Sequence, residues 1–356
     1  MTQAPLYSLS ALLVPLHRLA TTAVRWARLR PWLRAGLRPA LRTTLMATLV
    51  AALLSLTLQP AWAEPLRVSV LMHASAGGGE DTLRSALDIA QAQTPAFIVV
   101  NGLKDKRESC SDRLFRRRKA LLEAADKPVF LSMAGSDWGD CRDRRGRSAE
   151  SVWLGLLREQ LYGDISWNGA KHLRLRRQSA VPAFRSYAEN TRWSVQEVMF
   201  ATLHMPGPNN HYVSAAGRNS EFEDRLTANR DWLKRLAQHA TAERQKAIVL
   251  FSDARLWPAM RLQPGVRDGF KEMRSALRAF ANKVRVPVLL VQGPAPNGKA
   301  TSAIEWQGNF AQLSLPRGVA LLEVDTDATV PFALADQNTE PGNASTGSGT
   351  ADTTTP

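Results

Sequence analysis

Residues 127–141 read KPVFLSMAGSDWGDC, an apolar run typical of a β-strand that ends in small, acidic and aromatic residues. In an α/β sheet, polar groups directly after a strand project into the crevice beyond its carboxyl end, where ligands bind. The stretch therefore predicts a strand that delivers Ser136, Asp137 and Trp138 to such a crevice.

Four other apolar runs end in a similar way. They cover residues 96–100, 198–203, 247–251 and 288–291, and they are followed by Asn101 to Lys104, His204 to Gly207, Ser252 with Asp253, and Gln292 with Gly293. Because parallel strands present their carboxyl ends at one edge of a sheet, we expect a site assembled from these strand ends.

Hydrophobic periodicity around these runs predicts a layered α/β domain. Up to residue 133 the pattern is β-α-β-α-β, with strands near 67–72, 96–100 and 128–133 and helices near 81–93 and 112–125. The glycines at 77–79 favour a plain turn over a phosphate-binding loop, because neither the GK[ST] ending nor the GxGxxG spacing is present.

The second half of the chain predicts a hairpin and further helices. The hairpin covers 193–203, the helices lie near 148–162, 221–239 and 268–281, and closing strands lie at 310–315 and 319–324. In the helix at 148–162 we expect Val152, Leu156, Leu157 and Leu161 to face inward. We expect Arg116 to Lys119 to lie on a solvated helix face.

The first 63 residues indicate an export signal. They hold seven arginines and no acidic residue, then an apolar run at 45–58 and the small-x-small sequence Ala61-Trp62-Ala63. The run is shorter than the roughly 20 residues that span a bilayer, so we expect cleavage before Glu64 rather than an uncleaved anchor. A start codon placed too far upstream would also explain the long basic segment. The cleaved protein would be periplasmic or secreted, without a transmembrane helix.

Charge and composition narrow the class of protein. The hydrophobic content of 44% and the charged content of 22% are typical of a globular protein. The net charge of the chain is +14, and the seven arginines of the first 63 residues contribute half of it. The rest of the chain holds 39 basic and 32 acidic residues, a net charge of +7. Export and this uneven distribution disfavour nucleic acid as a partner. We expect one domain at 64–335 and a disordered tail at 336–356, which lacks bulky apolar residues.

Two cysteines, Cys110 and Cys141, each follow one of two successive predicted strands. If those strands are neighbours in the sheet, the sulfur atoms can meet, and an exported protein folds where disulfides persist. We therefore expect a disulfide. A thiolate metal pair and a free nucleophile are the alternatives, but no CxxC motif or histidine cluster supports them.

Several motifs, in order along residues 66–324, resemble the calcineurin-like metallophosphoesterases. They are Asn101-Gly102-Leu103-Lys104 with Cys110, the segment 136–141, the segment 187–193, and the segment 200–210 with the helix that carries Ala228-Asn229 and Trp232-Leu233. The resemblance implies two mixed β-sheets packed face to face with helices outside. It also implies a pair of metal ions at the strand ends, which activates a water to attack a phosphoester.

The chain departs from that family at most metal-ligand positions. The first aspartate of the family falls near His73, the aspartate of its GD motif on Gly102, the Asp-Asn of GDNE on Gly135-Ser136, and its late histidines on Gln292 and Pro296. The remaining candidate ligands are His73, His204 and Asp253, with Asp137 at the position of the family's acidic residue beside the metals. Each also has a structural interpretation, as a hydrogen-bonded histidine, a loop cap or part of an ion pair.

The resulting hypothesis is an exported metallophosphoesterase-like protein that has lost catalysis. It would use the former cleft, with Asn101, Lys104, Ser136, Trp138 and Asn209, to bind an anionic small molecule, a cell-envelope component or a protein partner. Basic residues of the loops, Lys104, Arg107, Arg142, Arg144 and Arg145, would surround its mouth. No cofactor is expected on this hypothesis. The alternative is an active phosphoesterase with a reduced site that holds Mn, Fe or Zn, and with Asp137 as acid or base.

Overall fold

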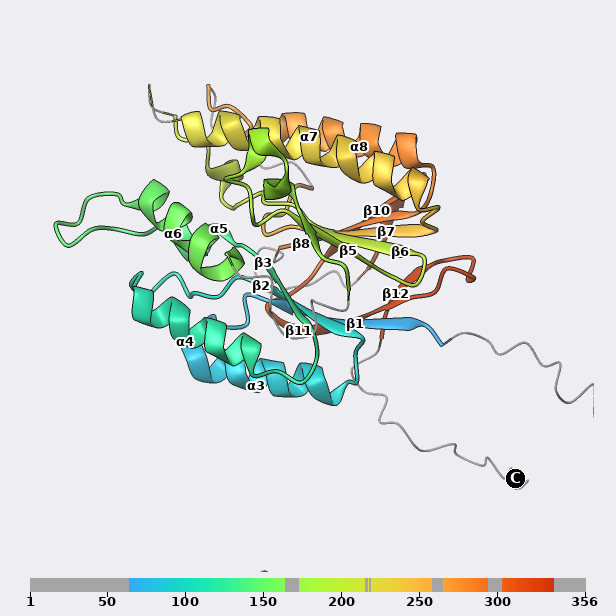
Figure 1. Cartoon of the computed structure of the whole chain (residues 1–356), viewed down its shortest axis with the longest axis horizontal. Coiled ribbons are helices and arrows are strands. Elements are labelled where there is room, and N and C mark those ends of the chain that lie inside the picture. Colours follow the sequence, from blue (N-terminus) through green and yellow to red (C-terminus); the bar gives the residue numbers. More distant parts are fainter. Residues whose placement is uncertain are drawn as a thin grey trace, which may run out of the picture. The chain divides into compact units, whose positions relative to one another are not determined.

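Two mixed β-sheets pack face to face, with helices on both outer sides (Figure 1). This computed structural model describes residues 64–163, 173–214, 217, 219–257, 265–293 and 303–335, which all belong to the unit that begins at Glu64. The predicted leader, Pro296 and the predicted tail lie outside the described residues. The α/β fold class with two mixed sheets and flanking helices is confirmed.

One sheet has five strands in the order β12-β11-β1-β2-β3. The strands are β1 (Leu66–Met72), β2 (Phe97–Asn101), β3 (Val129–Ser132), β11 (Gly318–Val324) and β12 (Phe332–Leu334). β1, β2 and β3 are parallel, whereas β11 runs antiparallel to β1 and β12 antiparallel to β11. The parallel strands end at one edge of the sheet, with Met72, Asn101 and Ser132 in register.

The other sheet has seven strands in the order β4-β5-β6-β7-β8-β10-β9. They are β4 (Arg176–Arg177), β5 (Thr191–Val195), β6 (Val198–Thr202), β7 (Ala247–Phe251), β8 (Val288–Gln292), β9 (Glu305–Gln307) and β10 (Phe310–Ser314). β6, β7, β8 and β10 are parallel, and β4, β5 and β9 run antiparallel to their neighbours. The predicted hairpin is confirmed as β5 and β6.

Aromatic side chains fill the space between the sheets. Phe97 and Phe130 of the five-stranded sheet meet Trp193 and Phe200 of the seven-stranded sheet, and Phe130 stacks on Trp193 at 3.8 Å between ring centroids. Alternation along each strand places these large rings on the inner face, because neighbouring residues of a strand point to opposite sides. This core fixes the two sets of strand ends relative to each other.

Helices cover the outer faces of the two sheets (Figure 1). α3 (Gly79–Ala92) and α4 (Asp112–Glu123) lie on the five-stranded sheet, and α7 (Ser220–Ala242) and α8 (Lys271–Val284) lie on the seven-stranded sheet. The short α5 (Gly135–Trp138) and α6 (Glu150–Tyr162) follow β3. The described part of the chain also contains the 3₁₀ turns η2 (Gln178–Ala180), η3 (Pro182–Phe184) and η4 (Asn209–His211). No described helix combines the length and apolar character that a membrane crossing requires.

Two sequence-based expectations about helix faces are wrong in part. Leu157 and Leu161 of α6 are buried as expected, but Val152 and Leu156 are 63% and 46% exposed, and Leu154 faces inward in their place. Arg116 and Arg117 of α4 are exposed as expected. Arg118 of α4 is buried rather than solvated, since Glu80 and Glu108 hold its guanidinium group. Both errors arise where tertiary contacts, and not local periodicity, decide which side of the helix is covered.

Candidate functional site

Asp253 connects the strand ends of both sheets. It follows β7 and is 5% exposed. Its Oδ1 lies 2.7 Å from Nε2 of His73, which follows β1, and its Oδ2 accepts hydrogen bonds from the amides of Gly135 at 2.7 Å and Gly207 at 2.9 Å. Burial opposes the charged carboxylate, but the His73 ring and the two amides outweigh it and hold the pKa of Asp253 below its usual value.

His73 is held in a fixed orientation by this ion pair. Its backbone lies in the left-handed region at φ 46°, a conformation that non-glycine residues rarely adopt and that directs the ring toward Asp253. Burial disfavours the protonated ring, but the bond to Asp253 and its charge raise the pKa of His73 above the ordinary value. The structure thus brings together two of the three predicted metal ligands.

His204, the third predicted ligand, belongs to a separate network. Its Nδ1 lies 2.9 Å from Glu189 Oε1, and its Nε2 lies 3.3 Å from Nε1 of Trp138. An indole N–H can only donate, so Nε2 of His204 accepts and Nδ1 carries the proton. Burial lowers the pKa of His204, which agrees with a neutral ring. Both nitrogen atoms are engaged, and neither has a free lone pair for a metal ion.

Glu189 and Arg158 extend this buried network to α6. Arg158 donates to both carboxylate oxygens of Glu189, at 2.5 and 3.0 Å. Burial alone would raise the pKa of Glu189, but the charge of Arg158 and the hydrogen bond that His204 donates lower it to about 2. The network therefore consists of a carboxylate, a guanidinium and a neutral imidazole.

Asp137 accepts backbone hydrogen bonds instead of facing open space. It is fully buried, and its oxygens accept from the amides of Leu103 at 2.8 Å, Lys104 at 3.0 Å and Ala134 at 3.0 Å. Burial raises the pKa of Asp137 despite these amides. The side chain ties the loop after β2 to the start of α5, in agreement with the loop-cap interpretation.

The predicted ligand-binding residues take different places. Lys104 is buried, and its Nζ donates to the carbonyl oxygens of Asp105 and Glu108, so it does not lie at a cleft mouth. Trp138 is 1% exposed and packs against His211 at 4.4 Å between ring centroids. Asn209 contacts the segment before α8. Its Nδ2 donates to the carbonyl oxygen of Arg267, and its Oδ1 accepts from the amide of Gly269.

Asn101 and Ser136 carry unsatisfied polar atoms. Within the described part of the chain, Oδ1 of Asn101, Oγ of Ser136 and Oγ of Ser252 are buried without a hydrogen-bond partner. Buried polar atoms are normally paired, so these oxygens are positions where a polar atom of water or of a ligand would bind. Asn101 ends β2, Ser136 lies in α5 shortly after β3, and Ser252 directly follows β7.

Gly102, Gly135 and Gly293 pack too closely against neighbouring groups for larger residues. A Cβ atom at Gly135 would lie 2.2 Å from the carbonyl oxygen of Gly207, and one at Gly102 would lie 3.1 Å from Nδ1 of His73. Gly293 directly follows Gln292. A Cβ atom at Gly293 would lie 1.6 Å from the carbonyl oxygen of Asp253. The loops that would surround two metal ions thus contact one another.

These donors do not fit a two-metal centre. Oδ1 of Asp253 bonds His73 and Oδ2 bonds two amides, both nitrogens of His204 are engaged, and Gln292 donates to Ser314 Oγ and accepts from the amide of Leu256. Over the residues that the structure describes, no three or more His, Cys, Asp and Glu side chains are grouped to hold a metal ion. The candidate metal ligands Asp253, His204 and Gln292 are thus occupied by hydrogen bonds within the protein.

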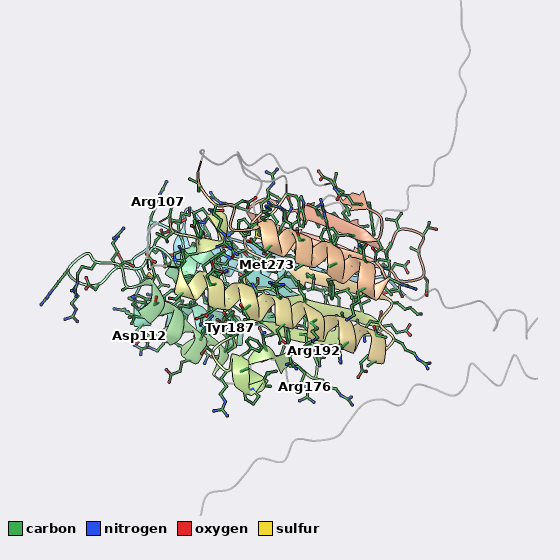
Figure 2. The ribbon with its side chains drawn as sticks, turned by 90° about the horizontal axis from the view of Figure 1, so that it is seen from above. Arg107, Asp112, Arg176, Tyr187, Arg192 and Met273 are labelled. Carbon is green, nitrogen blue, oxygen red and sulfur yellow. A yellow bond between two sulfur atoms is a disulfide. The ribbon has the colours of Figure 1, made fainter. Side chains whose placement is uncertain are left out.

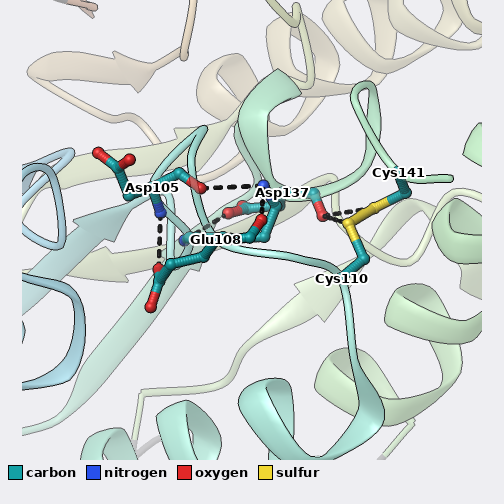
Figure 3. The surroundings of a disulfide bond; sticks show 6 residues. Asp105, Glu108, Cys110, Asp137 and Cys141 are labelled. Carbon is teal, nitrogen blue, oxygen red and sulfur yellow. Dashed lines mark hydrogen bonds between the residues drawn. A yellow bond between two sulfur atoms is a disulfide. The ribbon is translucent and has the colours of Figure 1, made fainter.

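The predicted disulfide between Cys110 and Cys141 is confirmed, with 5.5 Å between the Cα atoms. Figure 3 shows both sulfur atoms beside the carbonyl oxygen of Asp137, at 4.0 and 3.5 Å. The cysteines lie close together because β2 and β3 are parallel neighbours. The bridge joins the loop after β2 to the loop after α5.

A groove of about 600 Å³ opens beside His73, between α3 and the start of β11. Its polar lining includes His73, Asp81 and Arg317, and its apolar lining includes Ala86, Ile89 and Val319. Arg317 is exposed. Among the candidate ligands, His73 alone belongs both to the strand-end network and to the lining of this groove.

A second groove, of about 510 Å³, lies where the glycines at 77–79 meet the loop after β2. Arg107 and Arg113 line it, but so do Glu80, Asp105 and Glu108. These acids already bind the groove's other basic groups and its backbone, with Glu80 near Arg117 and Glu108 near Arg118. The plain-turn interpretation of the glycines fits this internally neutralised groove.

Sequence reasoning missed Arg158, Glu189 and Arg317. Glu189 lies in the segment 187–193 that supports the resemblance, so that motif offered a signal for it. Arg158 is separated from Glu189 by 31 residues and Arg317 stands at the turn before β11, and neither position carries a recognisable pattern. No protein-family model and no curated protein matches the chain.

Proposed function

We propose that the protein is an exported, non-catalytic relative of the metallophosphoesterases that binds an organic anion in the groove beside His73. The two-sheet fold and the ordered motifs support the relationship. The loss of catalysis is supported by the internal hydrogen bonds of Asp253, His204 and Asp137, which take up the groups that a hydrolase would direct at metal and substrate. No catalytic step is assigned to these residues.

The groove lined by His73 and Arg317 carries the proposal. Arg317 offers an exposed guanidinium group, which suits a carboxylate or phosphate because its donors match two anionic oxygens. Ala86, Ile89 and Val319 offer apolar contacts to the rest of the ligand. Asp81 in the same lining disfavours a ligand with a second anionic group nearby. One anionic group on a short aliphatic body fits this combination.

Calorimetric titration of the purified protein with four probes tests the proposal. Hexanoate and hexyl phosphate have both features, inorganic phosphate has only charge, and hexanol has only the aliphatic chain. We expect the first two to bind and Arg317→Gln to weaken them about tenfold, the size of a lost charged hydrogen bond. Arg230→Gln is the matched control, because Arg230 is exposed on α7 and outside the groove lining.

A phosphate-release assay with the hexyl phosphate probe separates the alternative hydrolase from a binding protein. Release of phosphate from hexyl phosphate, dependent on added Mn, Fe or Zn, would support an active phosphoesterase with a reduced metal site. Absence of binding by both anions, or equal loss in the Arg317 and Arg230 variants, would contradict the groove as an anion site.

A further inference from the structure

Positive charge is concentrated in two segments that the disulfide joins. Residues 104–118 and 140–147 hold eleven of the basic residues and five of the acidic ones, a net charge of +6. The whole range 64–335 holds 39 basic and 29 acidic residues, a net charge of +10. Cys110 lies in the first segment and Cys141 in the second, so the bridge fixes these charges next to each other.

The loop at residues 142–147, here called the arginine loop, holds four of these basic residues, and all four are exposed. It precedes α6 and extends past the helices at the left of Figure 1. Asp143 accepts from the amides of Arg145 and Arg147 and pairs with the Arg147 guanidinium, which shapes the turn and neutralises that arginine. In the described residues, Arg144 and Arg145 have no carboxylate partner for their side chains, so their charges face solvent.

The outer face of α6 continues this surface with apolar groups. Val152 and Leu156 stand one turn apart and are 63% and 46% exposed, with Gly155 beside them. The only exposed acid on this face is Glu159, one turn beyond Leu156, while Glu150 is paired with His211. The first two turns of the face are therefore apolar and next to the arginine loop.

The neighbouring α4 packs against α6. Gln160 of α6 donates to Asp112 at the start of α4 at 3.0 Å, and Trp153 packs on Phe115. Arg113, next to Asp112, is exposed. Figure 2 places Arg107 and Asp112 toward one end of the view. The helix α4 thus adds an exposed basic group to the part of the molecule that carries α6.

We propose that the arginine loop and the outer face of α6 dock the protein on an anionic lipid bilayer. Arginines attract the phosphate groups of such a surface, and aliphatic side chains enter the boundary between headgroups and acyl chains. A soluble phosphate would be held by converging donors in a pocket, whereas these arginines are exposed on a loop. An acidic protein would not require the aliphatic pair. This inference uses a different surface from the groove beside His73 and is independent of it.

Vesicle binding of the full chain tests the proposal. The probes are vesicles of phosphatidylcholine alone and vesicles with an equal amount of phosphatidylglycerol. We expect binding only to the second kind, falling as salt is added because exposed charges are screened. Arg144→Ala/Arg145→Ala should weaken binding by about 25-fold, at about fivefold for each arginine near the surface. The charge-matched control is Arg230→Ala/Lys234→Ala, two exposed residues of α7.

Substitutions of Val152 and Leu156, together with hydrogen exchange measured along the chain, complete the test. Val152→Ser/Leu156→Ser should weaken vesicle binding about tenfold without unfolding the protein, since both side chains are exposed. Hydrogen exchange should slow in residues 142–156 when the anionic vesicles are added, which separates this surface from any contact made by residues 1–63.

Equal loss in the loop and control variants would overturn the proposal, as would vesicle binding without protection of 142–156. Stronger binding to polyglutamate than to the vesicles would assign the surface to an acidic protein instead. Self-association that depends on Val152 and Leu156, without vesicle binding, would assign it to a second copy of the chain.

Discussion

At the scale of single residues, Asp253 has the largest structural role at the strand ends. It joins β1 through His73, the loop after β3 through Gly135 and the loop after β6 through Gly207. A buried carboxylate of this kind is stabilised only while each oxygen keeps its partners. These contacts join the strand ends of the two sheets, and they also occupy both oxygen atoms of the Asp253 carboxylate.

Replacing Asp253 with Asn should therefore destabilise the protein. The amide group of Asn would face an N–H donor where a carboxylate oxygen now accepts, and His73 would lose its charged partner. We expect a loss of about 3 kcal/mol in the free energy of unfolding, measured with urea. Asp81→Asn, at an exposed site, should change stability by less than about 0.5 kcal/mol. Similar values for the two variants would contradict the structural role.

Glu189 should make stability fall in acid. Its pKa is about 2 in the folded protein against 4.5 for an ordinary glutamate, so the folded state favours the charged form. The stabilisation is fully present above about pH 4.5 and is lost as the pH falls through about 2, to an extent on the order of 3 kcal/mol. Across this pH range, the free energy of unfolding should fall more steeply with decreasing pH in the natural protein than in Glu189→Gln. Parallel pH profiles would contradict this assignment.

At the scale of elements, α5 begins where the resemblance expects a metal ligand. Gly135 lies so close to Gly207 that a Cβ atom would meet its carbonyl oxygen at 2.2 Å. Restoring an acidic residue at this one position would therefore require the loop after β6 to move. The lack of a side chain at position 135 and the close contact between these two loops are therefore coupled through packing.

Gly135→Ala should lower the free energy of unfolding by about 1–3 kcal/mol, because backbone must shift to admit the methyl group. Gly155→Ala is the matched control. Gly155 lies inside α6 with open space around it, so Ala should raise stability by about 0.5–1 kcal/mol through helix propensity. Thermal melting of both variants checks the pair, and a neutral Gly135→Ala would mean that the strand ends are looser than described.

The sequence predicts the central strands of the sheets better than the short edge strands and the side-chain contacts around them. The strands β2, β6, β7 and β8 and the β5–β6 hairpin have strong apolar patterns and were predictable, as was the disulfide between neighbouring strand ends. The short edge strands β4, β9 and β12 are only two or three residues long, too short for a pattern. The outward turn of Val152 and the burial of Lys104 and Arg118 depend on residues distant in sequence, which local spacing does not encode.

The candidate site was predictable in its location but not in its chemistry. The strand ends do meet, and His73 lies beside Asp253. That the tryptophan of the SDWGD segment would occupy Nε2 of His204 follows only from the tertiary structure. Partner choice among buried polar groups is set by three-dimensional packing, so the sequence could name the candidate donors without showing that they are already paired.

At the scale of the whole molecule, the disulfide fastens the end that carries α5, α6 and the arginine loop. The cysteines are separated by 31 residues, which in the chain-entropy model corresponds to about 3–4 kcal/mol of stabilisation. Cys110→Ser/Cys141→Ser should lower the melting temperature by several degrees. Non-reducing peptide mapping of the natural protein should recover the linked pair, whereas two free thiols in protein from an oxidising compartment would contradict the bridge.

We expect the strand ends of the two sheets to hold the protein together and not to hold a catalytic metal pair. Elemental analysis of the purified protein, combined with a phosphodiesterase assay, tests it most directly. We expect far less than one Mn, Fe or Zn ion per chain and hydrolysis no faster than in buffer, with His204→Ala changing stability alone. About two metal ions per chain, together with phosphodiesterase activity that His204→Ala abolishes, would contradict the account.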